Sequence, residues 1–463
     1  MENNARLGQA RIPGLLWSLA VPAVCAQLVS LLYNLVDRIY IGQLPDGTLA
    51  MAALGICAPI VSVISGFTGL FGRGGSPLAS ICLGRQDRQQ AEQYLGNSFV
   101  LLVVSSLVIT AGVLAFEDPL LQTFGASPLT LPYARAYLSL YILGTLFVQV
   151  TVGMNYYITA QGFARTAMMT TMLGAGINLL LDPLFIFVFG MGVRGAALAT
   201  VLSQLVSFGW VMAFLGGKKP LLHLQVPRLR LSWPIVRAML GLGATPFFMS
   251  VSEGVLNICF NRQVSAYGGD AALSVMTILF SLFQFILLPV EGVAQGSQPI
   301  IGYNYGAGQI GRVRQTIRLA LLFCSAFTIL VTSALLLYPA WCIRLFSADA
   351  SLLALGCPML RIYIAGVFTV GANSTFQQTY NSLGQGGKAF FFAFLRKILL
   401  LIPLLYLLPA LFPWGVYAVV LAEPVSDILT ALTNALYFRR FLARLESPSK
   451  AADPAGMPEP ACS

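Results

Sequence analysis

A carboxylate ends a row of polar side chains inside the first long apolar stretch of the chain. The polar positions recur at spacings of three and four residues and so share one face of a helix: Gln27, Ser30, Asn34 and Asp37. A charged side chain in the hydrocarbon layer of a membrane is costly unless it faces a bundle interior or a wet cavity. Asp37 is therefore a candidate for binding a proton or a cation, with Asn34 as a secondary candidate. The alternative places Asp37 at the mouth of the helix in water, paired with Arg38.

The fifth and sixth apolar stretches carry further oxygen ligands. Asn178 and Asp182 are four residues apart and so lie on one helical face. Thr200 and Gln204 have the same spacing in the next stretch. If these side chains converge with Asp37, the site suits Na⁺ by oxygen coordination or H⁺ by titration of a carboxylate, and the sequence leaves both ions open. The alternative for Asp182 is a helix end in water.

Two more acids lie in apolar surroundings in the second half of the chain, Glu253 and Glu291. Each is a secondary candidate for ion coupling or for contact with a cationic substrate. The alternative is that each pairs with a cation of the chain, Arg262 or Arg38.

The composition identifies the chain as a polytopic membrane protein. Hydrophobic residues make up 57% of it and charged residues only 10%, and its mean hydropathy is +0.78, whereas soluble domains carry about 25% charged residues. About twelve apolar segments are long enough to span a bilayer. They are Arg11–Gly42, Leu49–Cys82, Tyr94–Phe116, Leu131–Thr159, Ala167–Phe189, Gly195–Leu215, Ile235–Ala266, Leu273–Tyr303, Ile317–Pro339, Leu353–Ser382, Phe390–Phe412 and Gly415–Phe438.

The net charge of +10 is distributed as in a membrane protein and not as in a nucleic-acid-binding protein. Basic residues collect in every second loop, which the positive-inside rule places in the cytoplasm together with both termini. The chain has a single histidine, His223, and its eight cysteines are scattered without CxxC spacing. This composition argues against a zinc site and against a histidine-based triad. The sequence therefore predicts neither an enzyme nor a cofactor beyond a coupling ion.

The two halves of the chain repeat each other at a nearly constant offset. Pro77 and Gly84 correspond to Pro299 and Gly306, both 222 residues later. Six segments in each half give both halves the same orientation, as in transporters with parallel repeats. The repeat predicts a six-helix lobe over residues 1–217, a basic cytoplasmic linker over 218–233, a second lobe over 234–445 and a disordered tail over 446–463.

The repeat also predicts a difference between the halves. Where the first half has Asp37, the second has Asn261, at an offset of 224. Proton or cation binding at this level therefore belongs mainly to the first lobe.

The chain resembles the multidrug and toxic compound extrusion (MATE) family. The resemblance rests on Pro22 and the polar face that ends at Asp37, on the stretch Gln295–Gly306, and on the duplicated six-helix halves. It implies an all-α, twelve-helix, V-shaped antiporter of the bacterial plasma membrane. Such a protein exports amphipathic organic cations and drugs in exchange for Na⁺ or H⁺ and so confers antibiotic resistance. We expect a monomer in contact with membrane lipid and with no nucleic acid.

Matched residue by residue, the resemblance implies that the ion-coupling site of the first lobe consists of Asp37, Asn178, Asp182 and Thr200. The same four residues would coordinate Na⁺ if that is the coupling ion. Pro22 matches a proline at which the first helix is proposed to bend. Glu253 resembles an acid of family members with a second-lobe Na⁺ site, but the tenth segment lacks their second acid and offers only Asn373, Ser374, Thr375 and Gln377. This difference favours the first lobe.

An alternative function is a flippase for a lipid-linked saccharide, because related transporters share the repeat plan. A flippase of this kind needs a basic cavity that holds pyrophosphate, whereas the intramembrane charges here are mostly acidic.

Overall fold

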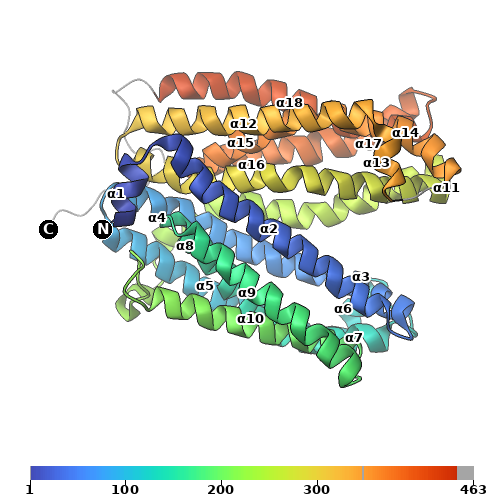
Figure 1. Cartoon of the computed structure of the whole chain (residues 1–463), viewed down its shortest axis with the longest axis horizontal. Helices are drawn as coiled ribbons and strands as arrows, with labels where there is room; N and C mark the ends of the chain where they lie inside the picture. The colour runs from blue at the N-terminus through green and yellow to red at the C-terminus, as the bar shows by residue number, and fades with distance from the viewer. Residues whose placement is uncertain (1, 347–348, 446–463) are drawn as a thin grey trace.

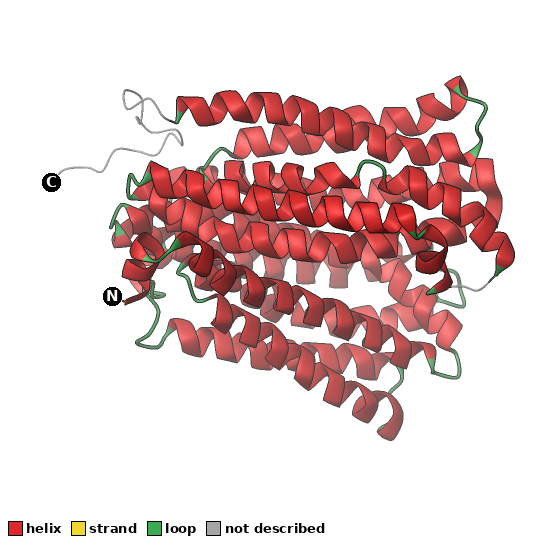
Figure 2. Cartoon of the chain, turned by 45° about the horizontal axis from the view of Figure 1, so that its top comes forward, coloured by secondary structure: helices red, strands yellow, loops and turns green. Residues whose placement is uncertain are grey.

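Helices make up nearly all of the chain in the computed structural model, which describes residues 2–346 and 349–445. A backbone in hydrocarbon must satisfy its hydrogen bonds within each segment, so apolar stretches of this length form helices. No strand occurs in the described residues, and Figure 2 shows helices joined by short loops. The fold is therefore all-α, as the sequence predicts. The predicted tail, residues 446–463, lies outside the described part.

The helices form two groups that follow each other along the chain (Figure 1). The first group is α1 (Glu2–Gln9), α2 (Ile12–Gly42), α3 (Gly47–Thr68), the π-helical turn η1 (Gly69–Arg73), α4 (Gly74–Gly84), α5 (Arg88–Ala115), α6 (Glu117–Thr123), α7 (Leu131–Tyr141), η2 (Ile142–Gly144), α8 (Thr145–Ala160), α9 (Ala164–Pro183), η3 (Leu184–Val188) and α10 (Val193–Leu215). After η4 (Val226–Leu229), the second group is α11 (Trp233–Gly306), α12 (Ile310–Leu337), α13 (Pro339–Arg344), α14 (Ala350–Ile364), η5 (Val367–Thr369), α15 (Val370–Ser382), α16 (Gly386–Phe394), η6 (Leu395–Leu401), α17 (Ile402–Leu411) and α18 (Val416–Arg444).

Eleven helical stretches in the described residues are long and apolar enough to cross a membrane. One of them, α11, has 74 residues and would be roughly 110 Å long at about 1.5 Å per residue. Gly269 interrupts it, with φ 65° and ψ −163°. Each half of α11 is long enough to span a bilayer of about 30 Å, so the structure is consistent with the twelve predicted spans.

The internal repeat is visible in the backbone. Gly192 precedes α10 with φ 56° and ψ −131°, and Gly415 precedes α18 with φ 58° and ψ −133°. These angles lie in a region open to glycine and strained for other residues. The same unusual turn therefore begins the last long helix of each half.

Helix α2 lies against both groups of helices (Figure 1). Its Leu19 belongs to a buried cluster that includes Ala164 of α9 and Ile300 of α11. The next residue, Ala20, packs with Val290 and Val293 of α11. The part of α2 that contains these contacts includes Pro22, which is buried inside the helix. The helix that carries Asp37 thus connects the two groups.

Candidate functional site

The first group of helices encloses a polar cavity of about 740 Å³, a volume typical of sites for drug-sized ligands. Helices α2, α3, α7, α8, α9 and α10 line it, and α11 contributes Gln295. The four polar residues of the α2 face all line it: Gln27, Ser30, Asn34 and Asp37. The spacing of these residues along α2 places them on this wall.

The structure brings Asp37, Asn178 and Asp182 together beside the cavity, which Asp37 and Asn178 line. The carboxyl groups of Asp37 and Asp182 lie within hydrogen-bonding reach of each other. Nδ2 of Asn178 donates to Oδ1 of Asp182 over 3.1 Å. Asp182 is 1% exposed, which excludes a helix end in water. Arg38 forms no ion pair with Asp37, so the paired alternative for Asp37 is also wrong.

The remaining first-lobe candidates lie on the same cavity without direct contact to the two acids. Thr200 and Gln204 of α10 line the cavity, and the Thr200 hydroxyl donates to the Ala196 carbonyl over 3.0 Å. Asn34 also lines the cavity and donates from Nδ2 to the Ser30 carbonyl over 2.6 Å. The cavity that Asp37 lines is therefore also lined by amide and hydroxyl groups.

Three tyrosines near Asp37 were missed by the sequence analysis. Tyr33 lies one turn before Asp37 on α2, and Tyr137 and Tyr141 come from α7. All three line the cavity and lie within electrostatic reach of Asp37. The sequence does contain a signal, because Tyr137 and Tyr141 are four residues apart inside an apolar helix, where a buried tyrosine hydroxyl needs a polar partner.

The second-half acids do not have the partners that the sequence suggested. Glu253 pairs with Lys397 of η6 over 3.5 Å, and not with Arg262 or Arg38. Lys397 is distant in sequence, and nothing in the spacing of the chain indicates this pair. Glu291 lies within electrostatic reach of Arg73, Glu253 and Lys397 but forms no ion pair with a described residue.

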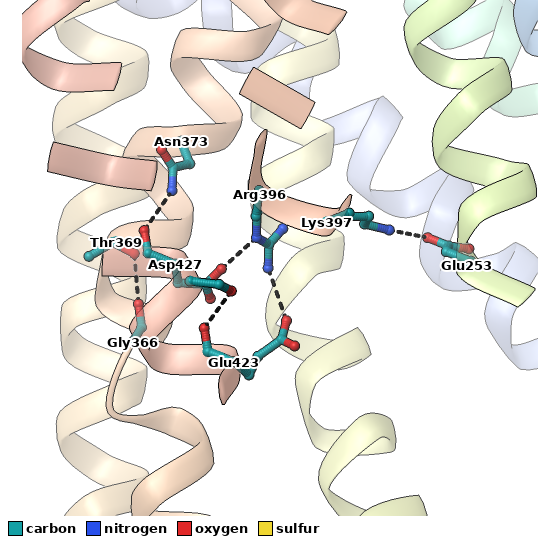
Figure 3. A network of polar contacts seen from close by, with 9 residues as sticks. Glu253, Gly366, Thr369, Asn373, Arg396, Lys397, Glu423 and Asp427 are labelled. Atoms are coloured by element: carbon teal, nitrogen blue, oxygen red, sulfur yellow. Dashed lines mark hydrogen bonds and ion pairs between the residues drawn. The ribbon is translucent and has the colours of Figure 1, made fainter. Parts of the chain in front are cut away.

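A buried charged network in the second group was also missed (Figure 3). Arg396 of η6 binds two acids of α18, Asp427 from Nε over 2.5 Å and Glu423 from Nη2 over 3.2 Å. The side chain of Asp427 is 1% exposed. Asn373 of α15 donates to the backbone carbonyl of Asp427 over 3.4 Å. The spacing of Glu423 and Asp427 by one helical turn was the available signal.

The side chains near Asp37 determine which ions this site can bind. Among residues 2–346 and 349–445, no group of three or more His, Cys, Asp or Glu side chains is arranged to hold a metal ion. The oxygens around Asp37 come from two carboxylates, one amide and hydroxyls, a set that matches H⁺ or a hard monovalent cation.

Curated relatives of this chain are multidrug exporters by name. The chain is 27% identical over 412 residues to the multidrug export protein MepA of Staphylococcus haemolyticus, with 89% of this chain and 90% of the relative covered. It is 25% identical over 417 residues to MepA of Staphylococcus aureus, with 90% and 91% covered.

Solved structures share the fold over almost the whole chain. A MATE protein in a bent conformation superposes with a TM-score of 0.90 at 21% identity, covering 96% of this chain and 98% of that one. An outward-facing multidrug resistance MATE family transporter of the MOP superfamily gives a TM-score of 0.89 at 21% identity, covering 96% and 99%. The MatE family model matches residues 22–184 and 247–407, which is most of the chain. The chain therefore belongs to the MatE family of transporters, the MATE family that its sequence resembles.

Proposed function

We propose that this protein is a secondary antiporter that exports amphipathic organic cations and drugs in exchange for H⁺ or Na⁺. The coupling ion binds at Asp37 and Asp182, with Asn178 orienting Asp182 and Thr200 lining the same cavity. The proposal puts the protein in a bacterial plasma membrane with both termini in the cytoplasm. The names of its multidrug export relatives support the substrate class.

The observation that carries the coupling site is the approach of the two carboxyl groups. Asp37 and Asp182 are within hydrogen-bonding reach, and two carboxylates can share a hydrogen bond only when one of them holds a proton. A bound cation between them relieves the same repulsion. Oδ1 of Asp37 is buried and has no donor among the described residues, which leaves it available to an incoming ion.

The position of α2 couples ion binding at Asp37 to a conformational change. Asp37 lies on the helix that packs against both α9 and α11. An ion shifts a conformational equilibrium only by its difference in affinity for the two states. Loading Asp37 changes the charge of α2 next to α9, so it favours one arrangement of α2 between the two groups of helices over the other.

The test is export of a fluorescent organic cation from proteoliposomes of the purified protein. An imposed pH gradient and an imposed Na⁺ gradient are applied separately. Asp37→Asn is expected to abolish export under the productive gradient while the protein still inserts. Asp270→Asn removes an exposed acid that does not line the cavity and serves as the matched control.

The outcomes separate the alternatives. Export driven by pH alone makes the site a proton relay, and export driven by Na⁺ at fixed pH makes it a cation site. Retained export in Asp37→Asn would overturn the site. Export under neither gradient would overturn the antiporter and favour the lipid-linked flippase.

A further inference from the structure

An arginine of the polar cavity has most of its hydrogen-bonding capacity unused. Arg73 ends the π-helical turn η1 between α3 and α4, and it lines the cavity. Gly69, Phe71 and Gly72 of the same turn are buried, whereas Arg73 is exposed to the cavity. The wider π turn changes the direction of the side chains relative to an α-helix, and such turns are frequent at functional sites.

Tyr156 of α8 fixes the guanidinium of Arg73. Nε donates to the Tyr156 hydroxyl over 2.8 Å, and the guanidinium carbon lies 5.1 Å from the centre of the Tyr156 ring. Both contacts orient the plane of the group. The two terminal nitrogens make no hydrogen bond or ion pair with any residue that the structure describes. They form the fork that binds a carboxylate in a bidentate manner.

The repeat shows that the fold itself does not require this charge. The position equivalent to Arg73, 222 residues later, is Gln295, which lines the same cavity as a neutral amide. The arginine is therefore specific to one of the two repeated halves. It stands in a cavity whose coupling residues are acidic.

One acid of α11 lies within electrostatic reach of this arginine. Glu291 is exposed, does not line the cavity and forms no ion pair with Arg73, so it does not occupy the guanidinium fork.

Resting on the export function proposed above, we propose that Arg73 is the residue that binds the carboxylate of those organic substrates that carry one. Tyr156 is a positioning residue, because it acts on the substrate only by holding Nε of Arg73.

The test compares two forms of one dye, a rhodamine with a free carboxylate and its methyl ester. Binding of each to the purified full-length protein is measured by fluorescence anisotropy at neutral pH. Arg73→Gln is expected to weaken binding of the free acid by about tenfold or more, the loss typical of one charge-assisted bidentate contact, and to leave the ester nearly unchanged. Arg73→Lys keeps the charge without the fork, so its loss is intermediate. Arg85→Gln removes an exposed arginine at the other end of α4, outside the cavity, and is the matched control.

Three results would overturn the proposal: wild-type protein that does not bind the free acid, an equal loss for acid and ester in Arg73→Gln, or no loss for either. Gradient-driven export of the ester from liposomes is measured on the same preparation. Failure of that export would count against the antiporter, whereas intact ester export without a selective loss in Arg73→Gln would count against the role of Arg73 alone.

Discussion

Gln298 donates a hydrogen bond from Nε2 to Oγ of Ser76 over 3.1 Å, and the two residues are 222 positions apart, the offset of the internal repeat. Equivalent positions of the two halves therefore meet face to face. The same relationship recurs at Gly84 and Gly306, where a Cβ on either would lie 2.0 Å from a carbonyl oxygen of the other helix, Tyr303 and Ile81 respectively. The axis that relates the halves passes between α4 and the end of α11.

Adding a methyl group at this contact is expected to destabilise the protein. In Gly306→Ala the new Cβ meets the backbone oxygen of Ile81, which cannot move without displacing α4. Overpacking of this kind costs about 1–3 kcal/mol or more, so the melting temperature in detergent should fall by several degrees. Gly311→Ala, which meets nothing within 4 Å, should leave it unchanged. An unaltered melting temperature in Gly306→Ala would contradict the close approach.

Loss of the Asn178 amide is expected to impair transport without unfolding the protein. Asn178→Ala removes the donor to Oδ1 of Asp182, and a hydrogen bond to a charged group contributes about 1.5–3 kcal/mol. Gradient-driven export should fall by about tenfold or more. The matched control is Asn257→Ala, an exposed asparagine of α11 outside the cavity. Equal export rates in the two variants would remove Asn178 from the site.

Local spacing explains which features the sequence predicted. The polar face of α2 and the pair Asn178–Asp182 follow from helical periodicity. In the structure the α2 face and Asn178 line one cavity, and Asn178 binds Asp182 behind it. The pair Glu253–Lys397 joins residues 144 positions apart, and no periodicity encodes such a contact. The same holds for the two partners of Arg396, which come from another helix, α18. Long-range pairs depend on how helices pack, and a single sequence carries little information on that.

Replacing Pro22 of α2 is expected to slow transport without lowering stability. Pro22 lies inside a continuous helix and has no N–H to donate to the carbonyl four residues earlier, a loss that costs about 3 kcal/mol in an ordinary helix. Pro22→Ala restores that bond, so the melting temperature should rise or stay the same while export slows. Pro13→Ala, in the first turn where proline removes no hydrogen bond, should change neither. Unchanged export in Pro22→Ala would mean that a bend at Pro22 plays no part.

The ion pair between Glu253 and Lys397 is expected to contribute little to stability, because its acid faces solvent. The side chains of Glu253 and Lys397 are 65% and 12% exposed and lie 3.5 Å apart, and pairs that solvent can screen contribute at most about 1 kcal/mol. Glu253→Gln should therefore shift the melting temperature only slightly. A large fall would show that the pair is shielded from water.

Breaking the neighbouring buried network of Arg396, Glu423 and Asp427 is expected to destabilise the protein strongly. Arg396→Met leaves Glu423 and Asp427 without their shared cation, and an unpaired buried charge costs about 3–5 kcal/mol. The variant should melt far below the wild type or fail to fold. Apolar residues at all three positions (Arg396→Met, Glu423→Leu and Asp427→Leu) remove every charge of the network and should restore much of the stability, because a buried ion pair is often no more stable than a well-packed apolar replacement. If the triple variant melts as low as Arg396→Met, the network contributes more than charge balance. A stable triple variant that exports the cationic dye normally would show that the network is structural.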